Sequence, residues 1–264
     1  MPAVHKAKTV HKKRLIINRN SRIEKGGRRL PCRLRWTARH GAGGVGAWLP
    51  FLRYLAERFD VICPDHPGFG RSGDLDHIRR IGDFASFYGD FIADLGVTRV
   101  HLVGASLGGW IATELAVRDT TALASLTLIA PCGLAVPGAP TANVFEWSAE
   151  ERVRNLYADP RLPEFLLALP PNPEEQAIQA RNEVTTQKVG REPLLHNPQL
   201  GEWLPRIDRP TLLLWGEDDR VVPPSHGPVF RDRIAGARLE VVRGCGHVPH
   251  IEKPALAAAL IADF

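Results

Sequence analysis

The segment VHLVGASLGGW, residues 100–110, decides how the rest of the chain is interpreted. A short apolar run ends in Gly104-Ala105-Ser106-Leu107-Gly108, and apolar residues at helical spacing follow it. The pattern G-x-S-x-G between a strand and a helix is typical of a nucleophile elbow, a sharp turn that exposes the serine hydroxyl. The small residues two before and two after the serine let the strand and the helix approach closely. We therefore predict that Ser106 is an exposed nucleophile and that the Leu107 N–H, at a helix N-terminus, can face an oxyanion.

On both sides of this segment, strand-like and helix-like stretches alternate. Short apolar runs of strand type are separated by segments with helical spacing, such as residues 82–95, and an alanine-rich helix over residues 254–264 ends the chain. This alternation predicts an α/β fold with a mostly parallel sheet. The strand-like runs besides that of residues 100–105 are residues 59–65, 124–130, 210–215 and 238–242.

Residues 131–205 interrupt the alternation. They contain several prolines and many helix-forming residues but no strand-like run, and residues 150–157, 162–169 and 173–188 are predicted to be helical. Long insertions of this kind are usually functional, so we predict a helical cap over the site, with a plain surface excursion as the alternative. Three aromatic side chains of the insertion could line a substrate pocket, although packing between cap and core is the favoured role. These are Phe145, Trp147 and Phe165.

Two further residues complete a chemical pattern with Ser106. A serine hydroxyl is a weak nucleophile until a base accepts its proton, and the base needs an acid that fixes its tautomer. Asp219 follows the strand-like run after the insertion, and His247 follows the last one. All three are predicted at the carboxyl ends of strands, where parallel sheets bind ligands. The chain order Ser, Asp, His is the one used by one large group of hydrolases. Asp218 is the second candidate for the acid.

The motifs together carry a resemblance to a known family. They are His40-Gly41-Ala42-Gly43, DHPGFGRS at residues 65–72, the elbow, GEDD at residues 216–219 with Val222-Pro223, and Gly246-His247 with Glu252-Lys253-Pro254. Over residues 40–264 the chain resembles the α/β-hydrolase superfamily, in its cap-bearing group near the carboxylesterases and the carbon–carbon bond hydrolases of aromatic-ring breakdown.

The resemblance implies several features of the fold and the site. The core would comprise residues 40–130 and 206–264, with helices flanking a mostly parallel central sheet and with residues 131–205 as the cap. It also implies Ser106, Asp219 and His247 as the catalytic residues and an oxyanion hole made by the backbone N–H groups of Ala42 and Leu107. Neither a cofactor nor a metal is expected.

The expected activity is that of a cofactor-free serine hydrolase acting on a hydrophobic carboxylic ester through an acyl-enzyme. A carbon–carbon hydrolase of aromatic meta-cleavage products is the alternative. Those enzymes often have Asn before and Met after the serine, and an aromatic residue after the histidine. This chain has Ala105, Leu107 and Val248 at these positions. A protein of another class, with the hydrolase fold but binding a ligand without turnover, is the third possibility.

The charge of the chain is unevenly distributed. Residues 1–39 contain 13 Lys and Arg residues and one acidic residue, Glu24, whereas residues 40–264 contain 21 basic and 28 acidic residues. The first 39 residues are predicted to be a basic segment of doubtful order. A nucleic-acid-binding or membrane-surface arm, a transit peptide and a shifted reading frame are alternatives. In particular, residues 32–39 alternate apolar and basic side chains, where this type of sheet needs a buried strand before His40.

Composition suggests a protein of the cytoplasm. No apolar run reaches the length of a membrane span or of a secretory signal, and the four cysteines lack the spacing of a metal site. We therefore expect reduced thiols, no membrane or nucleic-acid partner, and a small hydrophobic ester or acyl substrate. His40 and His66 are expected to hold loop geometry, Arg71 to brace its loop, and His250 not to bind a metal.

Overall fold

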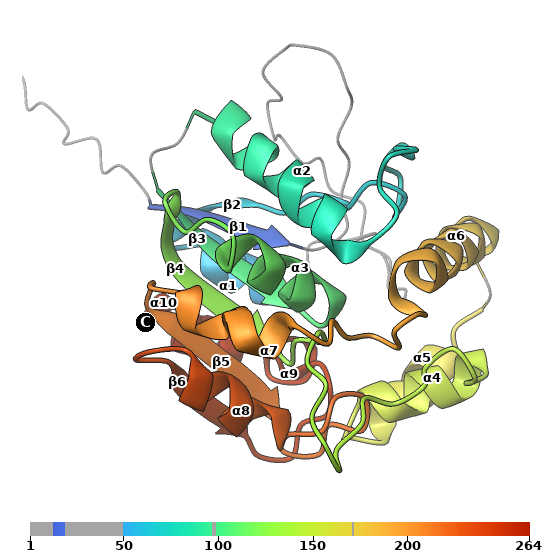
Figure 1. Ribbon diagram of the computed structural model, residues 1–264. Coiled ribbons are helices and arrows are strands. Elements are labelled where there is room, and N and C mark those ends of the chain that lie inside the picture. The colour runs from blue at the N-terminus through green and yellow to red at the C-terminus, as the bar shows by residue number, and fades with distance from the viewer. Residues whose placement is uncertain (1–12, 19–49, 97–98, 171) are drawn as a thin grey trace, which may run out of the picture.

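Among the residues that the structure describes, a six-stranded sheet forms the centre of the molecule (Figure 1). The computed structural model describes residues 13–18, 50–96, 99–170 and 172–264. The strand order is β2-β1-β3-β4-β5-β6, and all five neighbouring pairs are parallel, which confirms the α/β prediction. The strands are β1 (Lys13–Asn18), β2 (Phe59–Ile62), β3 (Val100–Ala105), β4 (Leu123–Ile129), β5 (Thr211–Gly216) and β6 (Arg238–Val242).

The position of β1 corrects one expectation. Residues 1–39 were expected to be of doubtful order, yet Lys13–Asn18 pairs with β2 on one side and β3 on the other, with Leu15 in register with Val61 and His101. The strand contains the one run of three large apolar residues in that segment, Leu15 to Ile17, and an inner strand needs such a run. The expectation failed because it gave more weight to the basic composition of residues 1–39 than to this short apolar run. Residues 32–39 lie outside the described residues.

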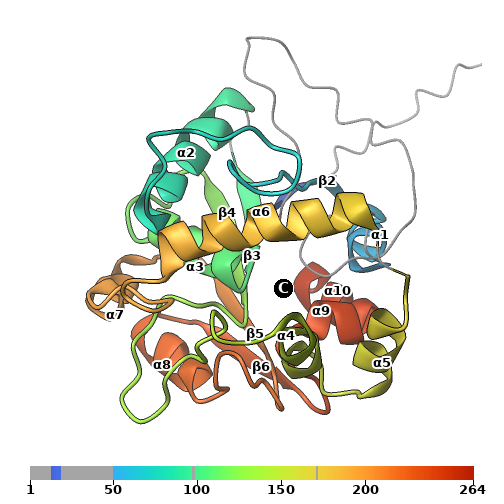
Figure 2. The same cartoon turned by 90° about the vertical axis from the view of Figure 1, so that its right-hand side faces the viewer.

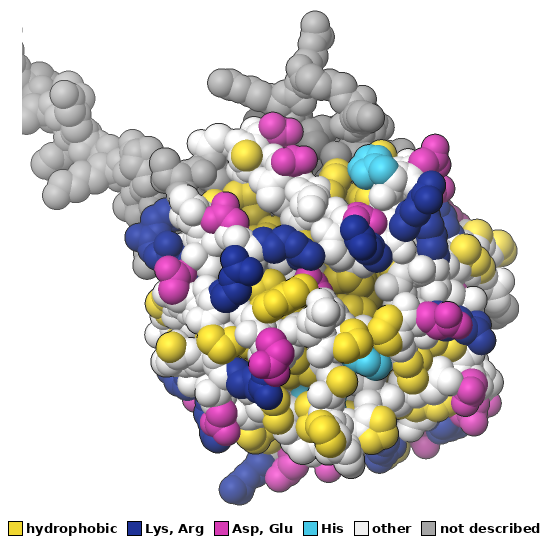
Figure 3. Space-filling model, in the orientation of Figure 1, with side chains coloured by type: hydrophobic (Ala, Val, Ile, Leu, Met, Phe, Trp, Pro, Cys, Tyr) yellow, Lys and Arg dark blue, Asp and Glu magenta, His cyan; other side chains and the backbone are white. Residues whose placement is uncertain are grey.

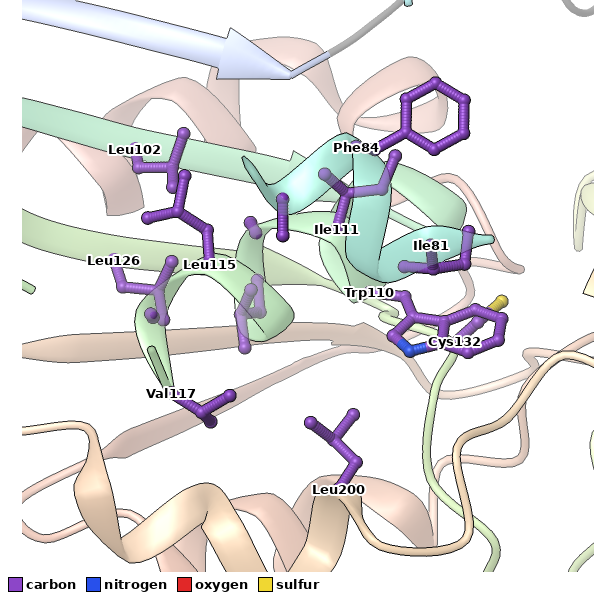
Figure 4. Close-up of a cluster of buried hydrophobic side chains, with 14 of the residues drawn as sticks. Ile81, Phe84, Leu102, Trp110, Ile111, Leu115, Val117, Leu126, Cys132 and Leu200 are labelled. Atoms are coloured by element: carbon purple, nitrogen blue, oxygen red, sulfur yellow. The ribbon is translucent and has the colours of Figure 1, made fainter. Parts of the chain in front are cut away.

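Helices cover both faces of the sheet. Alternate residues of one strand point to opposite faces. Leu213 and Trp215 belong to a core cluster with α2 and α3, whereas Leu212 and Leu214 pack with α1 and α10. Figure 4 shows side chains of the first cluster. The flanking helices are α1 (Pro50–Ala56), α2 (Ile81–Asp94), α3 (Leu107–Ala116), α8 (His226–Arg233), α9 (Pro249–Glu252) and α10 (Pro254–Ala262).

The chain between β4 and β5 is helical in the structure. Ser148 begins the first of these helices with a capping box to Glu151, and Asn172 accepts hydrogen bonds from the first turn of the longest one. In Figures 1 and 2, α4, α5 and α6 lie beyond the carboxyl ends of the central strands, at the same side of the molecule. We call these three helices, with the connections between them, the cap. The helical elements of this segment are α4 (Ala149–Leu156), α5 (Arg161–Leu167), α6 (Pro173–Gly190), α7 (Leu200–Trp203) and the 3₁₀ helix Leu204–Arg206.

Polar contacts hold α6 to the loop that follows β2. The buried Asn182 side-chain oxygen accepts the Gly70 N–H at 2.8 Å, and the Arg181 guanidinium donates to the Gly70 carbonyl at 3.0 Å. One turn further along, the Thr185 hydroxyl donates to the Gly68 carbonyl at 2.8 Å. These bonds satisfy backbone groups of an irregular loop, so α6 and the loop stabilise one another.

The three aromatic side chains that the sequence analysis singled out in the insertion have different environments. Phe145 and Trp147 are partly buried against the large core cluster, in agreement with a packing role. Phe165 is 56% exposed on α5, so the expected packing against the core is wrong for this residue. The helix α5 has seven residues and buries Pro163 alone among them.

The surface in Figure 3 carries basic and acidic side chains interspersed with one another. Within the described residues, no helix combines the length and the apolar character that a bilayer crossing would need. Three of the four cysteines, Cys63, Cys132 and Cys245, are buried free thiols, and Cys32 lies outside the described ranges.

Candidate active site

Ser106 lies in the turn between β3 and α3. Its φ of 54° and ψ of −118° are unusual for a residue with a Cβ atom, and such strain persists where the surrounding structure fixes it. The Ser106 N–H donates to the Ile129 carbonyl at 2.9 Å, and its carbonyl accepts from Trp110 N and Cys132 N. The backbone of the serine is thus tied to its own helix and to β4, and its side chain lies at the carboxyl edge of the sheet.

Close contact between β3 and α3 explains the glycines of the elbow. A Cβ atom on Gly104 would lie 2.4 Å from the Gly108 carbonyl oxygen, and one on Gly109 would lie 2.8 Å from Pro131 Cβ. Gly104 therefore has the role that the motif predicts. The need for Gly109 arises from Pro131, which is distant in sequence, so the motif did not reveal it.

This contact predicts that Gly104→Ala destabilises the protein by about 3 kcal/mol, at the upper end of the usual effect of overpacking. The atoms that the new methyl group would meet belong to the backbone, so no side-chain rotation can relieve the clash. Urea unfolding would measure the loss. Gly89→Ala is the matched control, because Gly89 is exposed on α2 and a Cβ atom there would meet no described atom within 4 Å, so we expect a gain of about 0.5–1 kcal/mol. Equal stability of the Gly104 variant and the wild type would contradict this account of the elbow.

His247 connects Ser106 to a carboxylate. Its Nε2 lies 2.8 Å from Ser106 Oγ, and its Nδ1 lies 2.9 Å from Asp219 Oδ2. A carboxylate can only accept, so Nδ1 carries the proton and Nε2 is left to accept the serine proton. The His247 and Asp219 side chains are both buried. Because water is excluded from this pair, the hydrogen bond between them is stronger than it would be at the surface.

The structure distinguishes between the two candidate acids. Asp219 is 6% exposed, and its second oxygen accepts the N–H groups of Val221 and Val222 at 2.8 and 3.0 Å, which fixes the orientation of the carboxylate. Asp218 is exposed, and its backbone N–H donates to the Cys245 carbonyl. Asp219 is therefore the acid that contacts His247.

One of the two expected oxyanion donors lies within the described residues. Leu107 is the first residue of α3, so its N–H has no carbonyl four residues earlier in the helix to bond. The Leu107 N–H comes directly after Ser106, at the N-terminal end of α3, where the helix dipole favours negative charge. Ala42, the other expected donor, and His40 lie outside the described residues.

This geometry can now be compared with known proteins. The model of the alpha/beta hydrolase family matches residues 40–260, which is most of the chain and includes Ser106, Asp219 and His247. The chain belongs to the alpha/beta hydrolase family.

Relatives of this hydrolase have names that denote different activities. The 2-hydroxy-6-oxo-6-phenylhexa-2,4-dienoate hydrolase of Comamonas testosteroni is 32% identical over 251 residues, which cover 85% of each chain. The monoacylglycerol lipase abhd6-B of Xenopus laevis is 29% identical, over 82% of this chain and 70% of the relative. A solved membrane phospholipase A has a TM-score of 0.69 at 27% identity, over 96% of this chain and 80% of that one.

Other residues singled out in the sequence have structural contacts in this hydrolase. His66 is buried, and its Nδ1 lies 2.8 Å from the Tyr88 hydroxyl, in agreement with a role in loop geometry. Arg71 braces its loop against the cap through an ion pair with Glu174. The His250 ring packs edge-on to Phe51. Within the described ranges, no three His, Cys, Asp or Glu side chains are grouped as a metal site would require.

Asp65 lies at the start of the loop after β2 that also contains His66 and Arg71, and its environment is unusual. It is 5% exposed, and one of its oxygens accepts the Arg71 N–H at 3.1 Å. The other oxygen has no hydrogen-bond partner among the described residues. Burial raises the pKa of this carboxyl to about 6, against the opposing effect of the Arg71 N–H and of the Arg71 and Arg181 charges.

We expect Asp65→Asn to become more stabilising, relative to the wild type, as pH rises. The folded pKa of about 6 exceeds the ordinary value of 3.8, so ionisation of Asp65 opposes folding. This penalty is absent below pH 3.8, grows between 3.8 and 6, and is complete above 6, where it reaches about 3 kcal/mol. Urea unfolding of both proteins from pH 4 to 8 would measure it. Asp76→Asn removes an exposed carboxyl of the same loop and serves as control. A stability difference that is independent of pH would refute the raised pKa.

Two features near Ser106, His247 and Asp219, which we call the triad, were not found by the sequence analysis. Cys132 Sγ lies 3.7 Å from Ser106 Oγ, and burial raises the pKa of this thiol to about 12, so it remains protonated. Figure 4 places Cys132 beside Trp110 in the core cluster. Its position three residues after β4, at the carboxyl edge of the sheet, is the signal that could have revealed it. The second feature is the set of contacts made by Glu252, described below.

Proposed function

We propose that this protein is a serine hydrolase that cleaves carboxylic esters of hydrophobic acids. The observation that carries the proposal is the pair of hydrogen bonds by which His247 connects the Ser106 hydroxyl to the Asp219 carboxylate. This arrangement has the requirements of nucleophilic catalysis: a nucleophile, a base within hydrogen-bond reach, and a group that orients the base.

In the proposed reaction, His247 Nε2 accepts the Ser106 proton while Oγ attacks the ester carbonyl carbon. The carbonyl oxygen becomes an oxyanion, which the Leu107 N–H stabilises. The imidazolium, held by Asp219, then donates its proton to the departing alcohol, and the acyl group remains on Oγ. A water molecule, deprotonated by His247, attacks the acyl-enzyme. The proton then returns to Oγ as the carboxylic acid leaves.

Three positions favour an ester over a carbon–carbon bond as the target. Ala105 and Leu107 flank the serine, and Val248 follows the histidine. These residues differ from the Asn, Met and aromatic residue that carbon–carbon hydrolases of ring cleavage often have there. Two of the similar proteins, a monoacylglycerol lipase and a phospholipase A, also have names that denote ester hydrolases.

Carbon–carbon hydrolysis is the second candidate. It is favoured by the 32% identity with the Comamonas testosteroni enzyme and by 30% identity with the enzyme of the same name from Burkholderia cepacia. The same triad would serve a vinylogous 1,5-diketone, whose carbonyl group also passes through an oxyanion.

Intact-mass spectrometry after exposure to a fluorophosphonate tests the proposed chemistry. We expect one adduct on the wild type and none on Ser106→Ala, because the reagent needs an activated serine. The absence of an adduct on folded wild-type protein would mean that the triad does not activate Ser106, and the proposal would fail.

A substrate comparison then separates the two bond types. We expect kcat/KM to be higher for p-nitrophenyl esters of two to eight acyl carbons than for 2-hydroxy-6-oxo-6-phenylhexa-2,4-dienoate. The reverse order would replace the ester proposal by the carbon–carbon one.

A further inference from the structure

The Glu252 side chain lies between the cap and the loop that carries His247. One carboxylate oxygen accepts the N–H groups of Ala158 and Asp159 at 2.8 and 3.1 Å, and the other accepts the Gly246 N–H at 2.5 Å. Ala158 and Asp159 belong to the connection between α4 and α5, more than 90 residues away in sequence. A single carboxylate therefore binds three backbone donors from two parts of the fold.

The same two segments also meet through their backbones. The His247 N–H donates to the Leu156 carbonyl at 2.9 Å. A Cβ atom on Gly246 would lie 2.6 Å from that carbonyl oxygen, so only glycine allows the approach. The consecutive N–H groups of Gly246 and His247 are thus both bonded, one to Glu252 and one to the cap.

These contacts fix the part of the backbone from which the His247 side chain extends. Hydrogen bonds to an ionised acceptor are stronger than neutral ones, and several of them on one carboxylate define its orientation. His247 Nε2 must remain within hydrogen-bond distance of Ser106 Oγ, now 2.8 Å, while Nδ1 remains on Asp219. A small displacement of the loop would therefore change the His247–Ser106 and the His247–Asp219 distance at the same time.

We propose that Glu252 is a positioning residue that couples the cap to the general base. By holding the segment from Leu156 to Asp159 against Gly246, its carboxylate places His247 in line between Ser106 and Asp219. The proposal rests on the proposed serine hydrolysis. It assigns no contact between Glu252 and the substrate.

Glutamine is the informative replacement because it preserves the size and shape of the side chain. Its amide has one acceptor oxygen and an NH₂ group that only donates. Glu252→Gln can therefore accept hydrogen bonds from the cap or from Gly246, but not from both. Glu217→Gln is the matched control, since the Glu217 carboxylate also accepts an N–H of this loop, that of Gly244 at 3.2 Å, but makes no bond to the described residues of the cap.

The test measures two quantities per active site: kcat for a p-nitrophenyl ester, with sites counted by fluorophosphonate titration, and the rate constant of fluorophosphonate inactivation. For Glu252→Gln and Glu252→Ala we expect both quantities to fall by about 10-fold to 100-fold, the size of effect that a misplaced catalytic group produces, with KM changed by less than about threefold. Glu217→Gln should stay within about twofold of the wild type.

Each outcome decides the question. Values per active site that remain within about twofold of the wild type in both variants would overturn the proposal, because a role in stability alone lowers the number of active sites and not their rate. Loss of the fold in Glu252→Gln as well as in Glu252→Ala would overturn it too, since the carboxylate would then hold the structure and not the base. A wild type that does not react with the fluorophosphonate would instead refute the proposed function itself.

Discussion

We expect Ser106→Ala to lower kcat for the best ester substrate by about 10⁴–10⁶-fold. The alanine removes the atom that attacks the carbonyl but leaves the turn, His247 and Asp219 in place, so KM should change little. His247→Ala should lower kcat to a similar level, because the serine and its base act as one unit. The double variant should be scarcely slower than either single one. Steady-state kinetics with a p-nitrophenyl ester would measure all three.

Ser72→Ala is the matched control for this experiment. Ser72 is buried, at 3% exposure, and its hydroxyl donates to the Asp65 carbonyl at 2.9 Å. It follows a glycine-rich loop and not a strand, so it lacks the elbow. We expect this variant to retain at least half of the wild-type kcat. Retention of more than a tenth of the wild-type rate by Ser106→Ala would refute the assignment of the nucleophile.

The parts of the site that short motifs specify could be predicted from the sequence. The elbow depends on local backbone geometry, and Gly104 and Ser106 are in the places that the motif requires. The order of strands and helices then put Asp219 and His247 at the same sheet edge, because all strands of the sheet are parallel. What the sequence left open was the choice between Asp218 and Asp219, since both follow the same strand. Burial and the direction of the side chain decide it, and both depend on the fold.

The strand at the start of the sheet shows a limit of reasoning from local pattern. Lys13–Asn18 has the six-residue length of an inner strand, but basic residues surround its apolar centre. Its pairing with β2 and β3 joins residues more than 40 positions apart, and no local signal specifies such a partner. The basic composition of residues 1–39 therefore outweighed the short apolar run in the sequence analysis.

Contacts between the cap and the core could not be predicted from the sequence either. The helices of the insertion were predictable from their composition. Their docking was not, because it depends on single side chains such as Asn182 and Glu252 that bond backbone groups of distant loops. Phe165 is exposed although it is an aromatic residue in a cap helix. The residue type alone therefore does not indicate which face of that helix packs against the core.

The remaining large effect is expected for Asp219→Asn, which should lower kcat about 10⁴-fold. An asparagine can place its NH₂ group toward His247 Nδ1, so the imidazole would carry its proton on Nε2 and could no longer accept the Ser106 proton. The substitution keeps the size of the side chain, and the remaining oxygen can still accept the N–H groups of Val221 and Val222. We therefore expect little change in the free energy of unfolding, so that the loss is one of chemistry and not of folding.

Asp218→Asn provides the comparison, because it removes the same charge one residue earlier from an exposed position. We expect its kcat to stay within about twofold of the wild type, since surface substitutions away from a network have small effects. Fluorophosphonate inactivation rates should follow the same order, because acylation and phosphonylation both need the serine proton to be removed. If Asp218→Asn lost more activity than Asp219→Asn, the hydrogen bond of 2.9 Å between Asp219 and His247 would not be the one that holds the base in its reactive tautomer.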